Sequence, residues 1–101
     1  MKHPLINKVD SAHYDSKENP TILDFERAYS VNDLMAWAKI TLAKYTHPAR
    51  ATKGQVEADK RKADTYREYY NFLDTIVKKY PVLKYVTAVN AYDVLGYEME
   101  Y

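Results

Sequence analysis

The chain of 101 residues contains no cysteine and only two glycines. The absence of cysteine excludes disulfides, thiolate zinc sites and thiol catalysis, and it fits a reducing compartment. The glycines, Gly54 and Gly96, stand alone in the sequence, so the chain has neither a P-loop nor a dinucleotide-binding glycine motif. They leave few positions where the backbone could wrap closely around a phosphate group.

An excess of charge of either sign is also missing, because 15 lysines and arginines balance 14 aspartates and glutamates. Such a chain creates no global field that would attract nucleic acid or an anionic membrane. General nucleic-acid binding is therefore not expected, and any phosphate recognition would have to be local. Residues 1–10 contain no apolar run of the signal-peptide type, and no stretch has the length needed to span a bilayer. We therefore expect a cytoplasmic protein without a membrane partner.

Hydrophobic residues at helical spacing are present over most of the chain. The length is that of one domain, and the spacing predicts an all-α fold, a small bundle of about four helices. Residues 1–19 lack this periodicity and are rich in polar side chains, so we expect an irregular N-terminal arm there. The 11 tyrosines suit helix packing and also the stacking of a nucleotide base.

The boundaries of the first two predicted helices follow from capping residues and prolines. Asn19 and Pro20 read as the cap and first turn of a short helix that ends near Ser30. Ser30 then offers a new cap, with Asp33 in the first turn of a second helix, where its charge meets the positive end of the helix dipole. Pro48 ends that helix, because a proline disfavours helical geometry at the residue before it.

A long third helix is predicted to begin with a capping box formed by Thr52 and Gln55. It would be roughly 40 Å long at 1.5 Å per residue. Its predicted packing seam consists of residues three and four apart: Val56, Asp59, Ala63, Tyr66, Tyr70, Leu73, Val77 and Tyr80. Pro81 would open a fourth helix that runs to Gly96 and is followed by a tail at 97–101. The inward-facing residues expected on it are Val82, Tyr85, Val86 and Val89.

Asp59 is the one acidic residue on the predicted seam of the third helix. One interpretation is that it lies close enough to the helix start to stay solvated and to interact favourably with the helix dipole. The other is that it faces a polar pocket, where it orients a cation or accepts a hydrogen bond from a substrate. The two interpretations predict opposite surroundings for this carboxylate.

Three cations could meet where the second and third helices join. The run of Lys60, Arg61 and Lys62, taken alone, favours a solvated helix face. Lys44 near the end of the second helix and Arg50 in the following loop suggest convergence instead, and convergent cations would neutralise a phosphate. No metal site is predicted, because the three histidines are too scattered and the nearby acids form no concentrated set.

The order of these motifs resembles a family of small bacteriophage proteins, described either as phage nucleotide kinases or without a function. The resemblance extends over residues 13–73, and its most specific part is the block from Asp59 to Tyr66. It rests on His13-Tyr14, Ile22-Leu23-Asp24-Phe25, Lys44-Tyr45 with Arg50, and Asp59-x-x-Lys62-Ala63-x-x-Tyr66.

The resemblance implies a nucleotide-binding protein of the host cell cytoplasm, with activity as a (deoxy)nucleoside monophosphate kinase and room for magnesium. Asp59 and Lys62 would then be catalytic, and the substrate-binding residues would be His13, Tyr14, Lys44, Tyr45, Arg50 and Tyr66. The alternative is a non-catalytic phage protein that binds and inhibits a host or defence factor through a tyrosine-rich surface. The long third helix also fits a homo-oligomer.

Overall fold

A computed structural model describes residues 1–5 and 22–101 of the chain. Its helices are α1 (Ile22–Ala28), α2 (Val31–Tyr45), α3 (Val56–Lys79) and α4 (Ala88–Leu95). Two short 3-10 helices, η2 (Pro48–Lys53) and η3 (Pro81–Tyr85), connect α2 to α3 and α3 to α4. The predicted all-α fold is confirmed for the described residues, whereas residues 6–19 of the predicted arm, with His13 and Tyr14, lie outside them.

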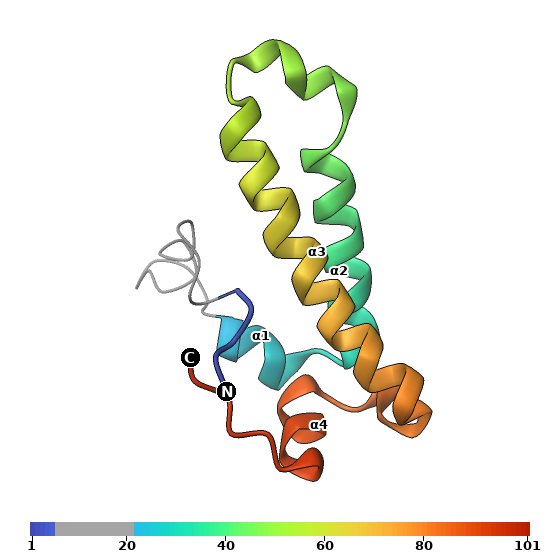
Figure 1. Cartoon of the computed structure of the whole chain (residues 1–101). Helices are drawn as coiled ribbons and strands as arrows, with labels where there is room; N and C mark the ends of the chain where they lie inside the picture. Colours follow the sequence, from blue (N-terminus) through green and yellow to red (C-terminus); the bar gives the residue numbers. More distant parts are fainter. Residues whose placement is uncertain (6–21) are drawn as a thin grey trace.

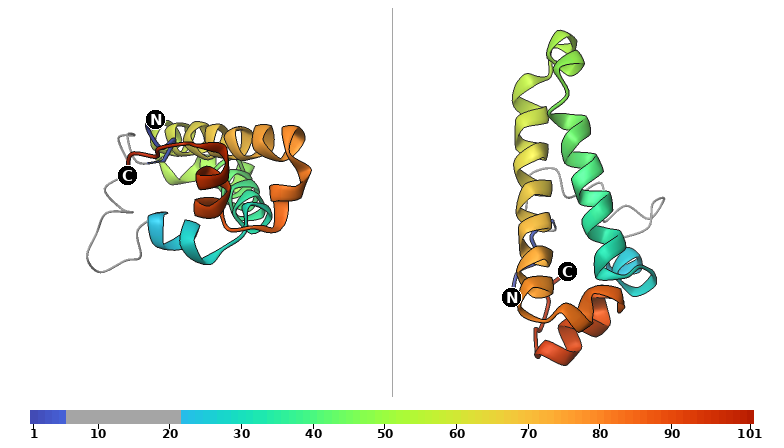
Figure 2. Two further views of the ribbon diagram at one scale, coloured as in Figure 1. Left: turned by 90° about the horizontal axis from the view of Figure 1, so that it is seen from below. Right: turned by 90° about the vertical axis from the view of Figure 1, so that its right-hand side faces the viewer.

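The molecule has two regions, a long helical hairpin and a base (Figure 1). The hairpin consists of α2 and α3, which lie side by side in opposite directions and are joined by η2 at the tip (Figure 2). The base contains α1, α4, η3 and both ends of the chain. The buried core runs from the hairpin into the base: Leu5, Ile22, Val31, Leu34, Ala38, Tyr66, Tyr69, Leu73, Ile76, Leu83, Ala88, Ala91 and Tyr92.

The starts of α2 and α4 are capped in the same way and are bound to each other. Ser30 Oγ accepts the N–H of Asp33 at 3.0 Å, as predicted, and Thr87 accepts the N–H of Asn90 at 3.3 Å. The two capping residues also pair as an antiparallel β-bridge. Because extended backbone is required at an N-cap, the same conformation provides both the caps and the bridge.

Replacing Ser30 by alanine is expected to lower the free energy of unfolding by about 1 kcal/mol, because the first turn of α2 loses a side-chain acceptor. Urea denaturation of the two proteins measures the difference. Ser30→Asn should recover most of it, since asparagine supplies an acceptor at the same position. Equal destabilisation by alanine and asparagine would show that the side-chain oxygen is not the cause.

The predicted capping box at the start of α3 is wrong. The segment before α3 forms η2, which begins at Pro48 and is capped by His47 Nδ1 accepting the N–H of Ala49 at 3.1 Å. Gly54 then adopts φ 69°, a left-handed conformation that ends η2, so α3 starts only at Val56. Gln55 occupies the N-cap without a side-chain hydrogen bond. Thr52 therefore lies within η2 rather than at the cap.

The packing seam of α3 differs from the prediction at both of its ends and at two positions after Tyr66. Its buried residues are Asp59, Ala63, Tyr66, Tyr69, Leu73 and Ile76. Tyr69 and Ile76 replace the predicted Tyr70 and Val77, and Val56 and Tyr80 are exposed. At each of these two places the sequence has two large residues in a row, Tyr69-Tyr70 and Ile76-Val77. Either member of a pair fits a helical stripe, so periodicity does not distinguish them. The helix has 24 residues, about 36 Å, close to the predicted length.

The predicted fourth helix is interrupted near its start. Pro81–Tyr85 is a 3-10 helix, Val86 is extended, and α4 begins only at Ala88. Val82 and Tyr85, expected to face inward, are 83% and 75% exposed, and Leu83 is buried instead. The extended Val86 accepts the N–H of Val31 at 2.9 Å, so the break in the helix serves the connection between α4 and α2.

The two ends of the chain lie together in the base. Glu100 donates its N–H to the carbonyl of Met1 at 2.7 Å, and His3 donates its N–H to the carbonyl of Glu100 at 3.3 Å. His3 and Leu5 are fully buried. The predicted tail at 97–101 contains no helix and is bound to the N-terminal residues. Within the described residues, no helix combines the length and apolar character needed to cross a bilayer.

Candidate functional site

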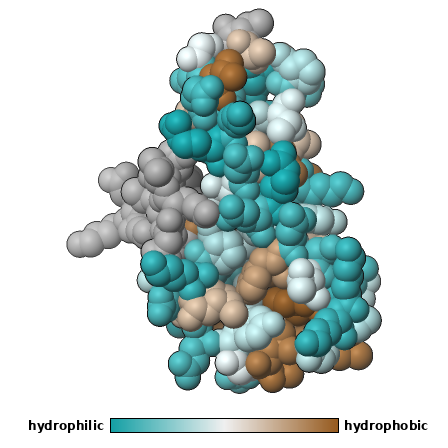
Figure 3. All heavy atoms as spheres, viewed as in Figure 1, coloured by the Kyte–Doolittle hydropathy of each residue, from teal (hydrophilic) through white to brown (hydrophobic). Residues whose placement is uncertain are grey.

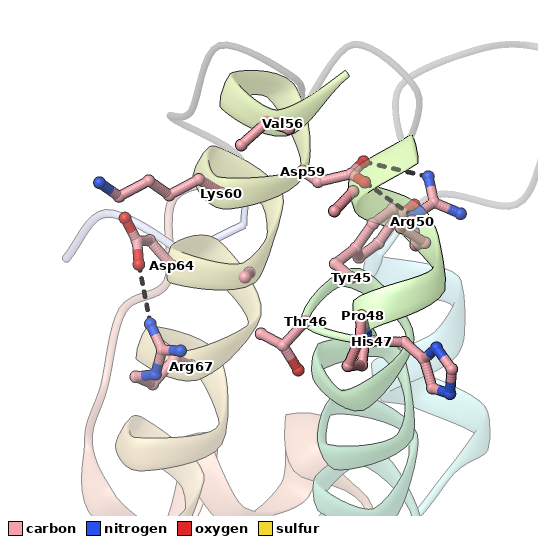
Figure 4. Close-up of a pocket in the computed structure, with 12 residues that line it drawn as sticks. Tyr45, Thr46, His47, Pro48, Arg50, Val56, Asp59, Lys60, Asp64 and Arg67 are labelled. Atoms are coloured by element: carbon pink, nitrogen blue, oxygen red, sulfur yellow. Dashed lines mark hydrogen bonds and ion pairs between the residues drawn. The ribbon is translucent and has the colours of Figure 1, made fainter. Parts of the chain in front are cut away.

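The tip of the hairpin brings together the cations and the carboxylate that the sequence had singled out. We call Lys44, Tyr45, Arg50, Asp59 and Lys62 the Tyr45 cluster. The end of α2 supplies the first two residues, η2 supplies Arg50, and the first turns of α3 supply the others. The turn at Gly54 reverses the chain, so that η2 faces the start of α3. Figure 4 shows Tyr45, Arg50 and Asp59 converging between the two helices.

Asp59 and Arg50 form a two-pronged ion pair. Arg50 Nε donates to Asp59 Oδ2 at 2.8 Å, and Arg50 Nη2 donates to Asp59 Oδ1 at 3.0 Å. Only 6% of the Asp59 side chain is exposed. The solvated interpretation of Asp59 is therefore wrong, and the carboxylate orients a cation as the other interpretation required. Such a planar fork fixes the direction of the guanidinium as well as its position.

The charge of Asp59 is maintained by its surroundings. The hydrogen bonds from Arg50 lower the pKa of the Asp59 carboxyl, more than burial raises it, and the charges of Lys62 and Lys44 act in the same direction as Arg50. The hydrogen bond to Asp59 in turn raises the pKa of Arg50. Asp59 is therefore ionised at neutral pH and acts as a hydrogen-bond acceptor.

Three cations surround the ring of Tyr45. The charged ends of Lys44, Arg50 and Lys62 lie 5.2, 5.0 and 5.3 Å from its centroid, within the range of cation–π attraction. Among the described residues, Arg50 is the only one of the three in an ion pair. Three positive charges against one carboxylate leave the Tyr45 cluster with a positive excess, although the chain as a whole is nearly neutral.

A cleft of about 470 Å³ adjoins the cluster and shares Tyr45, Arg50 and Asp59 with it. Its opposite wall is the outer face of α3, with Lys60, Asp64 and Arg67 (Figure 4). Asp64 accepts a hydrogen bond from Arg67 at 2.7 Å, and both side chains are largely exposed, as expected for a surface ion pair. The cleft is thus open and lined by charges of both signs.

Tyr66 belongs to the site in a different role from the predicted one. It is 7% exposed, its ring stacks on Tyr45 at 6.1 Å and 17°, and it stands perpendicular to Trp37 at 5.4 Å. Burial raises the pKa of Tyr66 to about 12. Because neighbouring rings cover it, Tyr66 supports Tyr45 from behind. The structure thus unites six of the eight predicted site residues, and His13 and Tyr14 lie outside the described residues.

Metal ligands are not gathered at this site. Within residues 1–5 and 22–101, no group of three or more histidine, cysteine, aspartate or glutamate side chains is placed to hold a metal ion. The cleft carries two carboxylates, and both are already ion-paired, Asp59 with Arg50 and Asp64 with Arg67. A magnesium ion, if one takes part, would therefore need phosphate oxygens and water for most of its ligands.

The base contains a second polar cluster, which sequence analysis missed. Glu26 of α1 is fully buried and accepts hydrogen bonds from three tyrosine hydroxyls. Tyr69 and Tyr92 donate to Oε2 at 2.5 Å each, and Tyr101 donates to Oε1 at 2.7 Å. His3 Nε2 lies 3.0 Å from Oε1, without meeting the geometry of a hydrogen bond. The carboxylate thus connects α1, α3, α4 and both ends of the chain.

The partners of Glu26 keep it ionised inside the protein. Burial raises the pKa of its carboxyl, but the contact with His3 and the hydroxyls of Tyr69 and Tyr92 outweigh burial, so the pKa is lowered. The N–H of Leu5 donates to His3 Nδ1 at 3.1 Å, which leaves the proton of the neutral ring on Nε2, facing Glu26. One signal in the sequence was available, because Glu26 lies on the apolar stripe with Ile22 and Phe25.

Comparisons with protein-family models, with curated proteins and with solved structures found no match to this chain.

Proposed function

We propose that the Tyr45 cluster binds the phosphate of a nucleotide and that the adjoining cleft holds the nucleoside. The observation that carries this proposal is the gathering of Lys44, Arg50 and Lys62 within 5.3 Å of one aromatic ring, with only one of them ion-paired among the described residues. A phosphate monoester carries close to two negative charges, which the cluster complements. The resemblance to the phage family, by an independent route, selects the same residues.

The size and lining of the cleft support a ligand with both charged and apolar parts. Its volume of about 470 Å³ is within the range of small-molecule sites. Val56, Ala51 and Pro48 offer apolar surface beside the charged residues. Tyr45 and Arg50 belong to both the cluster and the cleft, so a phosphate held by the cations would direct the nucleoside into the cleft.

The proposal extends from binding to catalysis: the protein would transfer a phosphoryl group as a nucleotide kinase. Phosphoryl transfer depends on neutralising charge and aligning the two substrates, with little covalent work for the protein. Asp59 is the carboxylate of the cluster, and its lowered pKa makes it an acceptor for a substrate hydroxyl at neutral pH. Each of its oxygens keeps a second lone pair beside the bond to Arg50. In this role Lys62 would neutralise the charge of the transferred group.

Lys44→Ala and Lys62→Ala are each expected to weaken the binding of a deoxynucleoside monophosphate about tenfold or more, because each removes a charge-assisted contact. Isothermal titration calorimetry with the mono- and triphosphates, with and without magnesium, measures this. Lys79→Ala is the matched control, since Lys79 also lies on α3 above a tyrosine ring, Tyr80, at 5.6 Å, but at the far end of the helix. Its affinity should equal that of the wild type.

Asp59→Asn separates binding from catalysis. It should retain nucleotide binding, because the cations remain, and it should abolish phosphoryl transfer, because the amide is a poorer acceptor. If folded wild-type protein binds no nucleotide at concentrations on the order of 1 mM, the proposal is wrong. If the wild type binds nucleotide but transfers no phosphoryl group, the nucleotide-binding function stands and the kinase activity is rejected.

Recognition of another protein is the alternative function, and one observation favours it. Val82 and Tyr85 of η3 and Val94 of α4 are 83%, 75% and 71% exposed. Figure 3 shows hydrophobic residues gathered in the lower part of the molecule, where the base lies. Contiguous exposed apolar surface marks interaction sites, and tyrosine is enriched at their binding hot spots. Inhibition of a host factor becomes the leading hypothesis if nucleotide binding fails.

A further inference from the structure

The short helix η3 presents an apolar face to solvent. Val82 and Tyr85 are 83% and 75% exposed, whereas Leu83 between them is buried. The two exposed residues are three positions apart, and side chains at this spacing eclipse one another in a 3-10 helix. Both therefore lie on the same side of η3, and neither contributes its side chain to the core.

Lysines without an ion pair flank this apolar face. Lys79 at the end of α3 and Lys84 of η3 each lie 5.6 Å from the ring centroid of the tyrosine that follows. Among the described residues, neither is in an ion pair, whereas Lys78 is bound to Asp74 at 3.0 Å. Residues 75–92 contain these three lysines and no acidic residue. We call Lys79, Val82, Lys84 and Tyr85 the η3 surface.

The η3 surface is remote from the Tyr45 cluster. Lys62 of that cluster and Lys79 are seventeen residues apart on α3, about 25 Å along the helix axis. The η3 helix lies in the base, where it packs on α3 and α2 (Figure 1). A ligand on the η3 surface would therefore not compete with a nucleotide at the hairpin tip.

The apolar side chains and the lysines together decide which ligand the η3 surface fits. Two copies of the chain that met through this surface would bring lysines against lysines, which costs free energy. A nucleic acid would gain from the two lysines but nothing from Val82. A polypeptide segment with apolar and acidic side chains gains from both, because its apolar groups leave water and its carboxylates meet the lysines.

We propose that the η3 surface binds an acidic amphipathic segment of another protein. Its apolar side chains pack on Val82 and Tyr85, and its aspartates or glutamates pair with Lys79 and Lys84. Exposed charges of this kind are screened by salt, whereas the apolar contact is not, so binding should weaken at higher ionic strength without being abolished. The interaction is independent of nucleotide binding, and it gives the alternative function a partner of defined chemistry.

The test is the selection of a random dodecapeptide library on the immobilised full chain. Peptides that also bind a variant with Val82→Ser and Tyr85→Ser are removed. Both side chains are largely exposed, so this double variant should remain folded, which circular dichroism checks. We expect the retained peptides to combine a net negative charge with leucine, phenylalanine or tryptophan. The most enriched one, made synthetically, should bind with a dissociation constant on the order of 0.1 mM or tighter.

Single substitutions locate the contact of this synthetic peptide. Val82→Ser should weaken its binding about fivefold or more through loss of apolar contact, and Lys84→Glu should do the same through charge repulsion. Ile40→Ser is the matched control, because Ile40 is also an exposed aliphatic residue, at 69%, beside a lysine, Lys39, but on α2. Its affinity should equal that of the wild type. Lys44→Ala should likewise bind the peptide normally, although the proposed function requires it to lose nucleotide affinity.

Four results would overturn the proposal. The selection could yield no peptide that distinguishes the wild type from the double variant, or the retained peptides could be neutral or basic. Light scattering could show a wild-type dimer that the double variant does not form, which would assign the η3 surface to a second copy. A fluorescent oligothymidylate could bind more tightly than the peptide and lose affinity with Lys84→Glu, which would assign the surface to nucleic acid.

Discussion

Replacing Glu26 by alanine is expected to lower the free energy of unfolding by about 3–5 kcal/mol, the range for breaking a buried charged network. The carboxylate is 0% exposed and accepts hydrogen bonds from Tyr69, Tyr92 and Tyr101. Its removal leaves three hydroxyls without their acceptor and the His3 ring without its charged neighbour, and it opens a cavity where the carboxylate was buried. A domain of this size has a total stability of roughly 5–15 kcal/mol, so the loss is a large fraction of it.

Urea denaturation followed by circular dichroism measures this difference. Glu26→Gln should cost less, about 1–3 kcal/mol, because the amide keeps the volume and one acceptor oxygen but loses the charge. Glu98→Ala is the control, since Glu98 is exposed near the same end of the chain, and its stability should stay within about 0.5 kcal/mol of the wild type. A Glu26→Ala protein as stable as the control would show that the cluster contributes nothing to stability.

Alkaline pH is the second condition expected to have a large effect. Burial and the neighbouring charge of Glu26 raise the pKa values of Tyr69 and Tyr92 well above the usual value of about 10. At a pH between the tyrosine pKa of the unfolded chain and that of the folded chain, the unfolded chain loses the two hydroxyl protons and the folded chain keeps them. Stability is therefore complete below about pH 10 and decreases above it, by about 1.4 kcal/mol per pH unit for each of the two hydroxyls.

Urea titrations at a series of pH values, with tyrosinate absorbance recorded in parallel, test this expectation. The buried hydroxyls of Tyr69 and Tyr92 should ionise only together with unfolding. Tyr92→Phe should be less stable at neutral pH. Its stability should decrease less steeply above pH 10, because only one hydroxyl, that of Tyr69, still couples its ionisation to unfolding. If all tyrosines ionise near pH 10 in a protein that stays folded, the buried hydroxyls do not bind Glu26 as described.

Local signals in the sequence were sufficient for part of the fold. The cap at Ser30 and the break at Pro48 depend on neighbouring residues only, and both are where the sequence predicts them. The seam of α3 was correct at Asp59, Ala63, Tyr66 and Leu73, and it was wrong by one residue where Tyr69 and Ile76 are buried. The choice there is made by contacts outside the helix: Tyr69 reaches Glu26 of α1 with its hydroxyl, and the end of α3 packs on η3. Periodicity within α3 contains no information about those contacts.

The two polar clusters differ in how far they could be foreseen. Asp59 was conspicuous as an acid on an apolar stripe, and Arg50 is only nine residues away, so a contact at the hairpin tip was a reasonable prediction. Glu26 obtains its partners from Tyr69, Tyr92 and Tyr101, which are 43, 66 and 75 residues away. No spacing rule connects such distant residues. The conformation of η2, which directs Arg50 toward Asp59, was likewise not predictable from its residues.

The distribution of contacts along the chain has a consequence for how the protein folds. The α2–α3 hairpin joins segments that are close in sequence, and its loop closes at little entropic cost. The base, by contrast, requires residues 1–5 to meet residues 98–101 and requires α1 to meet α4. We therefore expect the hairpin to form first and the base to assemble around it. Glu26 then remains hydrated through most of the folding reaction and loses its water only in the last step, when the two ends of the chain come together.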